Sequence, residues 1–165
     1  MYYIRVGDLE SVKKLVESDP GVIYYKSQMV GLNLLENSII NYNLDLVKYF
    51  YEIGLRIERQ YLGRTLLYHS MSCFDILEYL VLNGVDVNEC YESNGCVILH
   101  DTIFYSNVED MDQQVFFHIT KFLLEHGADP YIKNYGGHTP IDCCKNKEEF
   151  LNLIRLTKLN KIYGK

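Results

Sequence analysis

The sequence predicts an all-α fold, a solenoid of stacked helix–turn–helix units with protruding turns, and three observations lead to this prediction. The first is the stretch from Lys121 to Cys144, KFLLEHGADPYIKNYGGHTPIDCC, which reads as a helix end, a double turn and a helix start. The second is that this helix start recurs along the chain at a nearly constant spacing. The third is a set of glycines that keeps the same register.

The stretch from Lys121 to Cys144 carries ordinary helix stop and start signals. Gly127 suits the position just after a helix end, where a left-handed backbone conformation carries no Cβ penalty. Thr139 is a good N-cap, and Pro140 at the first helical position has no N–H to leave unsatisfied. The helix that ends here has an apolar face made of Phe122, Leu123 and Leu124.

The same stretch resembles the signature of an ankyrin repeat. In that family one repeat ends L-L-x-x-G-A-D and the next begins G-x-T-P-L-H-x-A. Residues 123–129 match the first half, and residues 137–142 match most of the second. The resemblance implies a stack of helix pairs with β-turn fingers, in which each repeat contacts its neighbours.

The rest of the chain repeats the pattern. The predicted helix starts are separated by 32, 32 and 42 residues and are Asn33, Thr65, Val97 and Thr139. Five residues after each start, where helices crowd together, the side chains are small: Ser38, Ser70, Thr102 and Cys144. The glycines expected to end the second helices are Gly54, Gly84 and Gly127. Those expected before each new first helix are Gly31, Gly63, Gly95 and Gly137.

This register divides the chain, as one domain over 1–165, into five repeats with incomplete ends. The predicted boundaries are 1–30 (partial), 31–62, 63–94, 95–136 with an insertion near 107–114, and 137–158 (partial), followed by a polar, frayed tail at 159–165.

Three repeats are expected to depart from the pattern. The first has lost most of its first helix, and Gly7 to Val12 enters its second. In the fourth, Val97 has no side-chain oxygen, so its helix start should be weaker by roughly 1 kcal/mol. The fifth is expected to have a shortened second helix around Phe150 to Ile154.

Composition places the chain among ordinary globular proteins. Of its 165 residues, 48% are hydrophobic and 23% charged, and no run approaches the roughly 18 apolar residues of a membrane span. The N-terminus lacks the apolar segment of a signal peptide, so a cytoplasmic location is expected, or the host cytosol if the protein is secreted or viral. Five cysteines in small or core-like positions are expected to be reduced thiols.

Charge is distributed unevenly. Residues 61–129 contain two basic and eleven acidic side chains, whereas residues 130–165 contain seven basic and three acidic ones. Binding to nucleic acid requires a basic surface, which the acidic middle does not offer. A basic protein partner fits better, and a merely solvated acidic face is the alternative.

The sequence offers little catalytic or metal chemistry. The five histidines lack the HExxH spacing, and no phosphate-binding glycine loop or nucleophile elbow is present. Cys90, Cys96 and His100 lie close in sequence but lack a fourth zinc ligand, and a local hydrogen-bonding role is expected for His100. We therefore expect no enzyme activity, no cofactor and no metal.

Surface residues remain as candidates for function. Fifteen tyrosines stand against no tryptophan, and tyrosine is enriched at interfaces. The resemblance implies binding through turn tips and through the concave face of the first helices. In this register the predicted partner-binding residues are Arg59, Tyr61, Arg64, Glu89, Tyr91, Glu92, Phe104, Tyr105, Lys133, Tyr135 and His138. Among these, Tyr61, Tyr91 and Tyr135 should form a row spaced by the repeat.

The function predicted on this basis is a non-enzymatic protein-interaction module, monomeric when free, that recognises and can inhibit one protein partner. One version is an immunity-type inhibitor of a basic effector or toxin. The alternative is a regulatory or scaffolding subunit of a larger assembly. The sequence names neither the partner nor the source.

Overall fold

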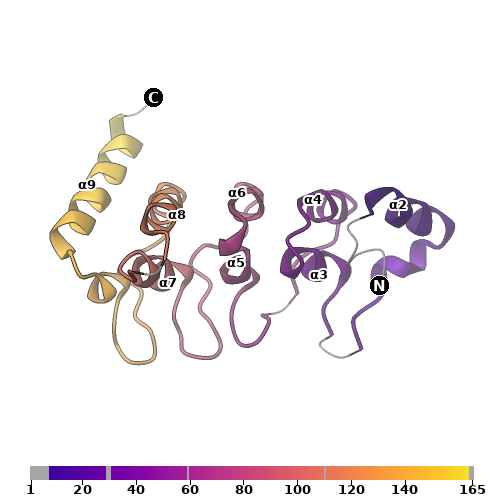
Figure 1. The fold of residues 1–165 in the computed structure, drawn as a ribbon, viewed down its shortest axis with the longest axis horizontal. Helices are drawn as coiled ribbons and strands as arrows, with labels where there is room; N and C mark the ends of the chain where they lie inside the picture. Colours follow the sequence, from indigo (N-terminus) through magenta and orange to yellow (C-terminus); the bar gives the residue numbers. More distant parts are fainter. Residues whose placement is uncertain (1–7, 29–30, 59, 110, 164–165) are drawn as a thin grey trace. The chain divides into compact units, whose positions relative to one another are not determined.

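The computed structural model describes residues 8–28, 31–58, 60–109 and 111–163 (Figure 1). The chain forms two compact units, unit 1 from Met1 to Asn83 and unit 2 from Gly84 to Lys165. The array of five repeats over 1–165 stays a prediction.

Unit 1 is built from helix pairs. Its elements are α2 (Leu9–Ser18), the 3-10 helix η1 (Pro20–Tyr24), α3 (Leu34–Ile40), α4 (Leu44–Glu52), α5 (Leu66–His69), the 3-10 helix η2 (Ser70–Ser72) and α6 (Phe74–Leu82). Helix α3 packs against α4 within its pair and against α5 of the next pair, while α4 packs against α6. First helices therefore stack on first helices and second on second, as a repeat array requires.

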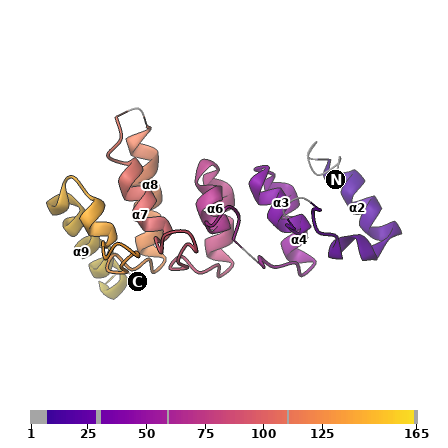
Figure 2. The same cartoon turned by 90° about the horizontal axis from the view of Figure 1, so that it is seen from below.

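Unit 2 has the same construction, except that its second helices are longer and one of its first helices is only a 3-10 turn. Its elements are α7 (Ile98–Tyr105), α8 (Gln113–Glu125), the 3-10 helix η3 (Pro140–Cys143) and α9 (Lys147–Tyr163). Helix α7 packs against α8 and η3, and α8 packs against α9, so both layers of the stack recur here. Figure 2 shows α7 and α8 side by side, with α9 next to them.

The predicted helix starts at Asn33, Thr65 and Val97 and the predicted stops are confirmed, whereas Thr139 precedes the 3-10 turn η3 instead of an α-helix. The side-chain oxygen of Asn33 accepts from the N–H of Glu36 at 2.9 Å, and the Glu36 carboxylate accepts from the N–H of Asn33 at 2.7 Å, a complete capping box. Thr65 caps α5 through the N–H of Tyr68 at 3.2 Å. All seven glycines named from the register have a positive φ, which L side chains rarely adopt: Gly31, Gly54, Gly63, Gly84, Gly95, Gly127 and Gly137.

Three of the four predicted small positions are fully buried, whereas the fourth, Cys144, is half-buried. Ser38, Ser70 and Thr102 have no exposed surface. Each hydroxyl donates to a backbone carbonyl one turn earlier, to Leu34, Leu67 and Leu99 respectively. The hydroxyl is thus satisfied locally, and a larger side chain would push the stacked helices apart.

The N-terminal helix begins where the sequence placed it. Helix α2 follows Asp8, whose carboxylate accepts from the N–H of Ser11 at 3.0 Å, and Val12 on its inner face is buried. The predicted loss of a first helix concerns residues 1–7 and lies outside the described residues.

The insertion predicted near 107–114 coincides with a loop and with the start of α8. Residues 106–112 connect α7 to α8, and α8 itself has 13 residues, against nine in both α4 and α6. At the weak start of α7, the imidazole Nδ1 of His100 accepts from the N–H of Val97 at 3.1 Å. This bond supplies half of the capping box that the valine side chain cannot complete.

The predicted end of the fifth repeat is wrong. Its first helix is reduced to the 3-10 turn η3, and its second helix is not shortened but is α9, with 17 residues. The tail expected to fray is helical as far as Tyr163, and residues 164–165 lie outside the described part. No glycine or proline interrupts residues 147–163, and Phe150, Leu153, Ile154 and Thr157 are buried along one side of α9.

Candidate functional site

The turn at the entry to α5 is a tight two-residue finger. The N–H of Tyr61 donates to the carbonyl of Arg64 at 2.9 Å, and the N–H of Arg64 returns the bond at 3.1 Å. The two central residues, Leu62 and Gly63, have φ values of 53° and 70°, as a hairpin turn of this length requires. Leu62 is 77% exposed, which makes it an apolar tip residue that the tyrosine pattern did not single out.

Two predicted residues flank that finger and are held in place. The carbonyl of Tyr61 bonds to Nε2 of His69 at 2.9 Å, and their rings lie 5.2 Å apart. The Arg64 guanidinium lies 4.2 Å from the centre of the Tyr68 ring, a cation–π contact. Both predicted residues are half-buried. Arg59, the neighbouring candidate, lies outside the described residues.

Unit 2 contains two fingers that bond to each other. In the first, the N–H of Tyr91 donates to the carbonyl of Cys96 at 2.7 Å, with Glu92 in the turn between them. In the second, Asn134 and His138 close the turn at 2.9 Å around Tyr135. The N–H of Tyr135 also donates to the carbonyl of Asn94 in the first finger, at 3.0 Å.

Tyr135 is the exposed aromatic residue of this pair of fingers. Its side chain is 74% exposed, and a Cβ built on Gly95 would come within 2.5 Å of its ring. Glycine is therefore needed at position 95 for the ring to lie against the backbone. The Asn134 side chain fixes the turn by accepting from the N–H groups of Gly136 and His138, both at 3.0 Å.

The expectation that Tyr91 lies at an exposed tip is wrong. Its side chain has no exposed surface and is among the largest buried side chains of the protein. It stands at the base of the first finger, where its N–H and carbonyl close the turn, so the ring faces inward. The predicted row of Tyr61, Tyr91 and Tyr135 is therefore not a row of exposed rings.

The charged candidates of unit 2 lie on its surface. Glu89 and Glu92 are exposed in and beside the first finger, and Lys133 is exposed just before the second. His138, at the end of the second finger, is also exposed. Its backbone carbonyl is hydrogen-bonded to Nε2 of His100 at 3.1 Å. The two fingers thus carry exposed side chains of both charges.

Helix α7 offers an exposed aromatic side chain on the face opposite its buried one. Ile98, Leu99, Thr102 and Ile103 are buried, whereas Phe104 is 56% exposed. Tyr105 is half-buried between two rings, Phe104 at 5.5 Å and Phe116 at 5.1 Å. The structure therefore leaves Phe104 as the accessible member of this predicted pair.

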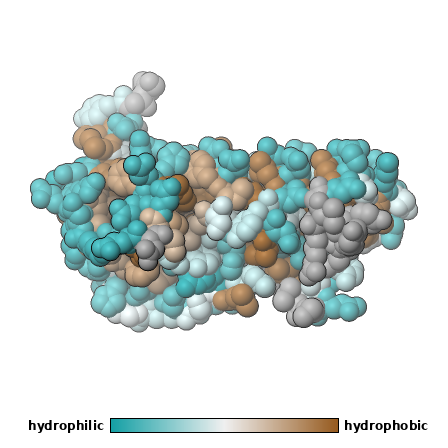
Figure 3. All heavy atoms as spheres, in the orientation of Figure 1, coloured by the Kyte–Doolittle hydropathy of each residue, from teal (hydrophilic) through white to brown (hydrophobic). Residues whose placement is uncertain are grey.

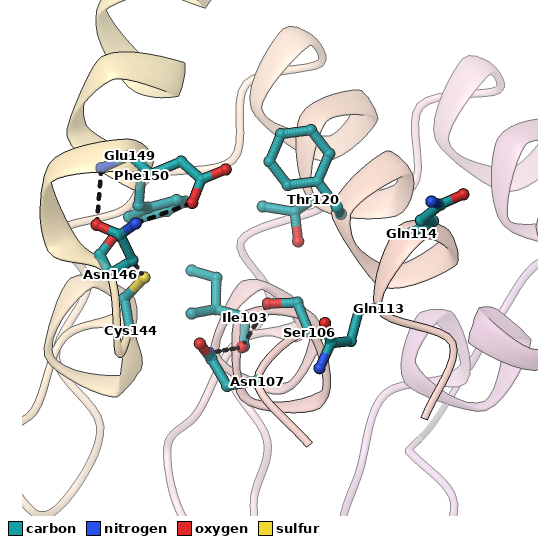
Figure 4. A pocket seen from close by; sticks show the side chains of 11 residues that line it. Ile103, Ser106, Asn107, Gln113, Gln114, Thr120, Cys144, Asn146, Glu149 and Phe150 are labelled. Atoms are coloured by element: carbon teal, nitrogen blue, oxygen red, sulfur yellow. Dashed lines mark hydrogen bonds between the residues drawn. The ribbon is translucent and has the colours of Figure 1, made fainter. Parts of the chain in front are cut away.

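A pocket of about 490 Å³ lies on another side of unit 2, and sequence reasoning missed it. Figure 4 shows its walls: Gln113, Gln114 and Thr120 from α8, and Cys144, Asn146, Glu149 and Phe150 from the start of α9 and the turn before it. Ile103 of α7, with Ser106 and Asn107 just after that helix, completes the walls. Three of the lining residues, Asn107, Gln113 and Gln114, belong to the predicted insertion near 107–114.

A second hollow of about 500 Å³ adjoins the first and shares Phe117, Asn146 and Glu149 with it. Leu153 and Leu156 of α9 complete its apolar side. In the space-filling view of Figure 3, brown apolar residues show between teal polar ones where α7, α8 and α9 lie. We call the two adjoining hollows the α8–α9 groove.

The chemistry of the pocket favours binding over reaction. Burial raises the pKa of the Cys144 thiol, and it likewise raises the pKa of Cys143, so neither is a ready thiolate nucleophile. The Cys144 thiol donates to the carbonyl of Asn146 at 3.3 Å. Among the described residues, no group of three or more His, Cys, Asp or Glu is placed to hold a metal ion.

The three residues considered as zinc ligands were Cys90, Cys96 and His100. The last two have hydrogen-bond partners within the protein. The Nδ1 of His100 accepts from Val97 and its Nε2 bonds to the carbonyl of His138, while the Cys96 sulfur receives Nδ2 of Asn134 at 3.5 Å. All five cysteines are reduced, Cys90 is exposed and the other four are half-buried, so none of them is a core residue. No described helix has the length and hydropathy needed to span a bilayer.

Comparison with known proteins points to one kind of fold. The chain is 36% identical, over 98 residues, to a protein of Rickettsia felis named "Putative ankyrin repeat protein". The match covers 59% of this chain and 40% of the relative, so the chain spans less than half the length of the curated relative it matches. No family model matches the sequence.

Proposed function

We propose that the chain is an ankyrin-repeat module without catalytic activity that binds a protein partner through the fingers and the exposed face of α7 in unit 2. The observation that carries the proposal is the exposure of two large aromatic side chains on rigid supports. Tyr135 is 74% exposed on a hydrogen-bonded turn, and Phe104 is 56% exposed on a helix.

Exposed aromatic rings on rigid backbone suit the centre of an interface. A tyrosine or phenylalanine buries a large area when a partner covers it, and it has few torsions to immobilise. The Asn134 hydrogen bonds and the contact between the Tyr135 ring and Gly95 fix the turn before any partner arrives. A preformed turn lowers the entropy lost on binding.

The charge of this surface favours a basic partner. Glu89 and Glu92 are exposed beside the fingers, within a stretch that contains eleven acidic and two basic residues. Exposed charges at the edge of an interface act mainly on the association rate, and their effect fades as salt rises. Arg59, Tyr61, Arg64, Tyr105, Lys133 and His138 stay predicted contributors to the interface.

The test is a titration against a partner first identified by a pull-down from the source cell. The double variant Phe104→Ala, Tyr135→Ala should weaken binding by about 2 kcal/mol or more, because aromatic side chains at the centre of an interface dominate affinity. Tyr24→Ala is the matched control, since Tyr24 is 80% exposed in unit 1. An equal loss of affinity in the double variant and in Tyr24→Ala, or no loss of affinity in either, would count against this surface.

The same pull-down separates the two versions of the function. A single basic partner whose activity falls when the protein is added supports an inhibitor, and we propose that this inhibition takes place in the cytoplasm. Recovery of a multi-subunit assembly with unchanged activity supports a scaffolding subunit instead.

A further inference from the structure

We propose that the α8–α9 groove is a second docking site, which takes an amphipathic α-helix with basic residues from a protein partner. It is separate from the finger surface of the proposed function. Three observations carry the inference: an apolar floor open to solvent, walls made of helices, and a lining that contains two acidic residues and no basic one.

The floor of the groove is apolar and accessible. Phe117 of α8 and Leu156 of α9 are 42% and 58% exposed, and the two line the same hollow. Buried neighbours, Phe150 and Leu153, continue this apolar surface into the interior. An apolar strip of this kind gains free energy when another apolar surface covers it.

The walls select a helix over an extended peptide. Both sides of the groove are α-helices whose backbone groups are already hydrogen-bonded, so no strand edge is offered for an added strand. Recognition must then occur through side chains. A helix satisfies its own backbone and presents apolar side chains at i, i+3 and i+4, which suits an apolar floor with polar edges.

The rim favours basic side chains on that helix. Glu148 and Glu149 line the groove, and Asp112 stands beside Gln113 at the start of α8. The nearby bases have partners within the chain: Lys145 Nζ bonds to the carbonyl of Asn107 at 2.7 Å, Lys147 Nζ to the Asp142 carboxylate at 3.5 Å, and Arg155 to Asn152 at 3.3 Å. No lining residue of either hollow is basic.

Synthetic peptides of defined pattern test the proposal on the full chain. The probe is an 18-residue helix with leucine on one face and lysine on the other, compared with a leucine/glutamate version and with a shuffled leucine/lysine peptide. Fluorescence anisotropy should show binding of the patterned lysine peptide only. Phe117→Ser should raise its Kd about tenfold or more, as should Leu156→Ser, which carries the test if the first variant does not fold.

Matched variants decide the location of the site. Val115→Ser is the control, because Val115 lies on the same helix and is 45% exposed but does not line the groove. Glu148→Lys should weaken binding severalfold at low salt and less at high salt. Phe104→Ala, Tyr135→Ala should bind the peptide as the unmodified chain does, so failure here is distinct from failure of the finger surface.

Three results would overturn the proposal. The first is the absence of binding by the patterned lysine peptide. The second is equal binding by Phe117→Ser and Val115→Ser. The third is a dimer of the chain in sedimentation that Phe117→Ser dissolves, which would assign the groove to a second copy.

Discussion

At the scale of single residues, one helix position holds three side chains that accept from the N–H of the N-cap residue, namely Glu36, His100 and Asp142. It is the third residue of each first helix, occupied by Glu36, Tyr68, His100 and Asp142. The imidazole of His100 connects the start of its own helix to the following finger, since Nδ1 accepts from Val97 and Nε2 therefore donates to the carbonyl of His138. Glu36 makes the corresponding connection as an acceptor, from the N–H groups of Asn33 and Glu58, both at 2.7 Å.

Glu36→Ala should destabilise unit 1. The Glu36 side chain has no exposed surface, and its removal leaves the backbone donors of Asn33 and Glu58 without this acceptor. Hydrogen bonds to a charged group contribute about 1.5–3 kcal/mol, so a loss of that order in the free energy of unfolding is expected in urea. Glu17→Ala, at an exposed residue of α2, is the control and should change it little. A loss below about 0.5 kcal/mol for Glu36→Ala would contradict this account.

Asp142 should contribute a stability term that depends on pH. Hydrogen bonds from the backbone N–H and then the hydroxyl of Thr139 lower its pKa from 3.8 to about 2. Because the folded state prefers the carboxylate, the contribution is complete above pH of about 4 and is lost as the pH falls toward 2. The difference in urea midpoint between the unmodified chain and Asp142→Asn should therefore shrink over that window. A difference that stays constant from pH 6 to pH 2 would refute the assignment.

At the scale of elements, α6 contains two leucines, close in sequence, that differ greatly in burial. Leu80 has no exposed surface, whereas Leu82, two residues later, is 62% exposed. Leu80→Ala should lower the free energy of unfolding by roughly 2–5 kcal/mol, because it leaves a cavity where α6 packs against α4. Leu82→Ala is the matched control and should cost less than about 0.5 kcal/mol. Denaturant unfolding checks both, and equal effects would mean that the helix register is wrong.

Local signals in the sequence predicted the elements well where a short motif determines the backbone. Glycines at positive φ and caps such as Asn33 and Thr65 act over a few residues, so their positions identify helix ends directly. The end of α9 was predicted wrongly, because the family pattern was followed past the point where this chain departs from it. The apolar residues Leu156, Leu159 and Ile162 continue the helical pattern, and no breaker intervenes before Gly164.

The candidate site was less predictable than the helices. Tyrosines were assigned to tips from repeat position alone, which does not tell whether a ring at the base of a finger points inward, as Tyr91 does, or outward, as Tyr135 does. The α8–α9 groove depends on contacts between residues far apart in sequence, such as Asn107 with Lys145. No local sequence motif predicts a contact of this kind.

At the scale of the whole molecule, construction from repeats determines how far along the chain a destabilising substitution should lower stability. In a stack where each repeat contacts its neighbours, stability is close to a sum of repeat and interface contributions. A defect confined to unit 1 should therefore lower the stability of unit 1 more than that of unit 2, and regions of one chain can then open at different free energies.

Leu80→Ala provides the corresponding test by hydrogen exchange. We expect amide protection to fall by several orders of magnitude in α3, α4 and α6 of unit 1, and much less in α7, α8 and the buried part of α9. The physical reason is that the cavity lies within unit 1, while the core of unit 2, with Leu99, Ile119 and Leu123 fully buried, keeps its own contacts. Leu82→Ala again serves as the control and should leave both profiles unchanged. A uniform loss of protection over all of these helices would show that the chain opens as one cooperative body, against the additive picture of a repeat stack.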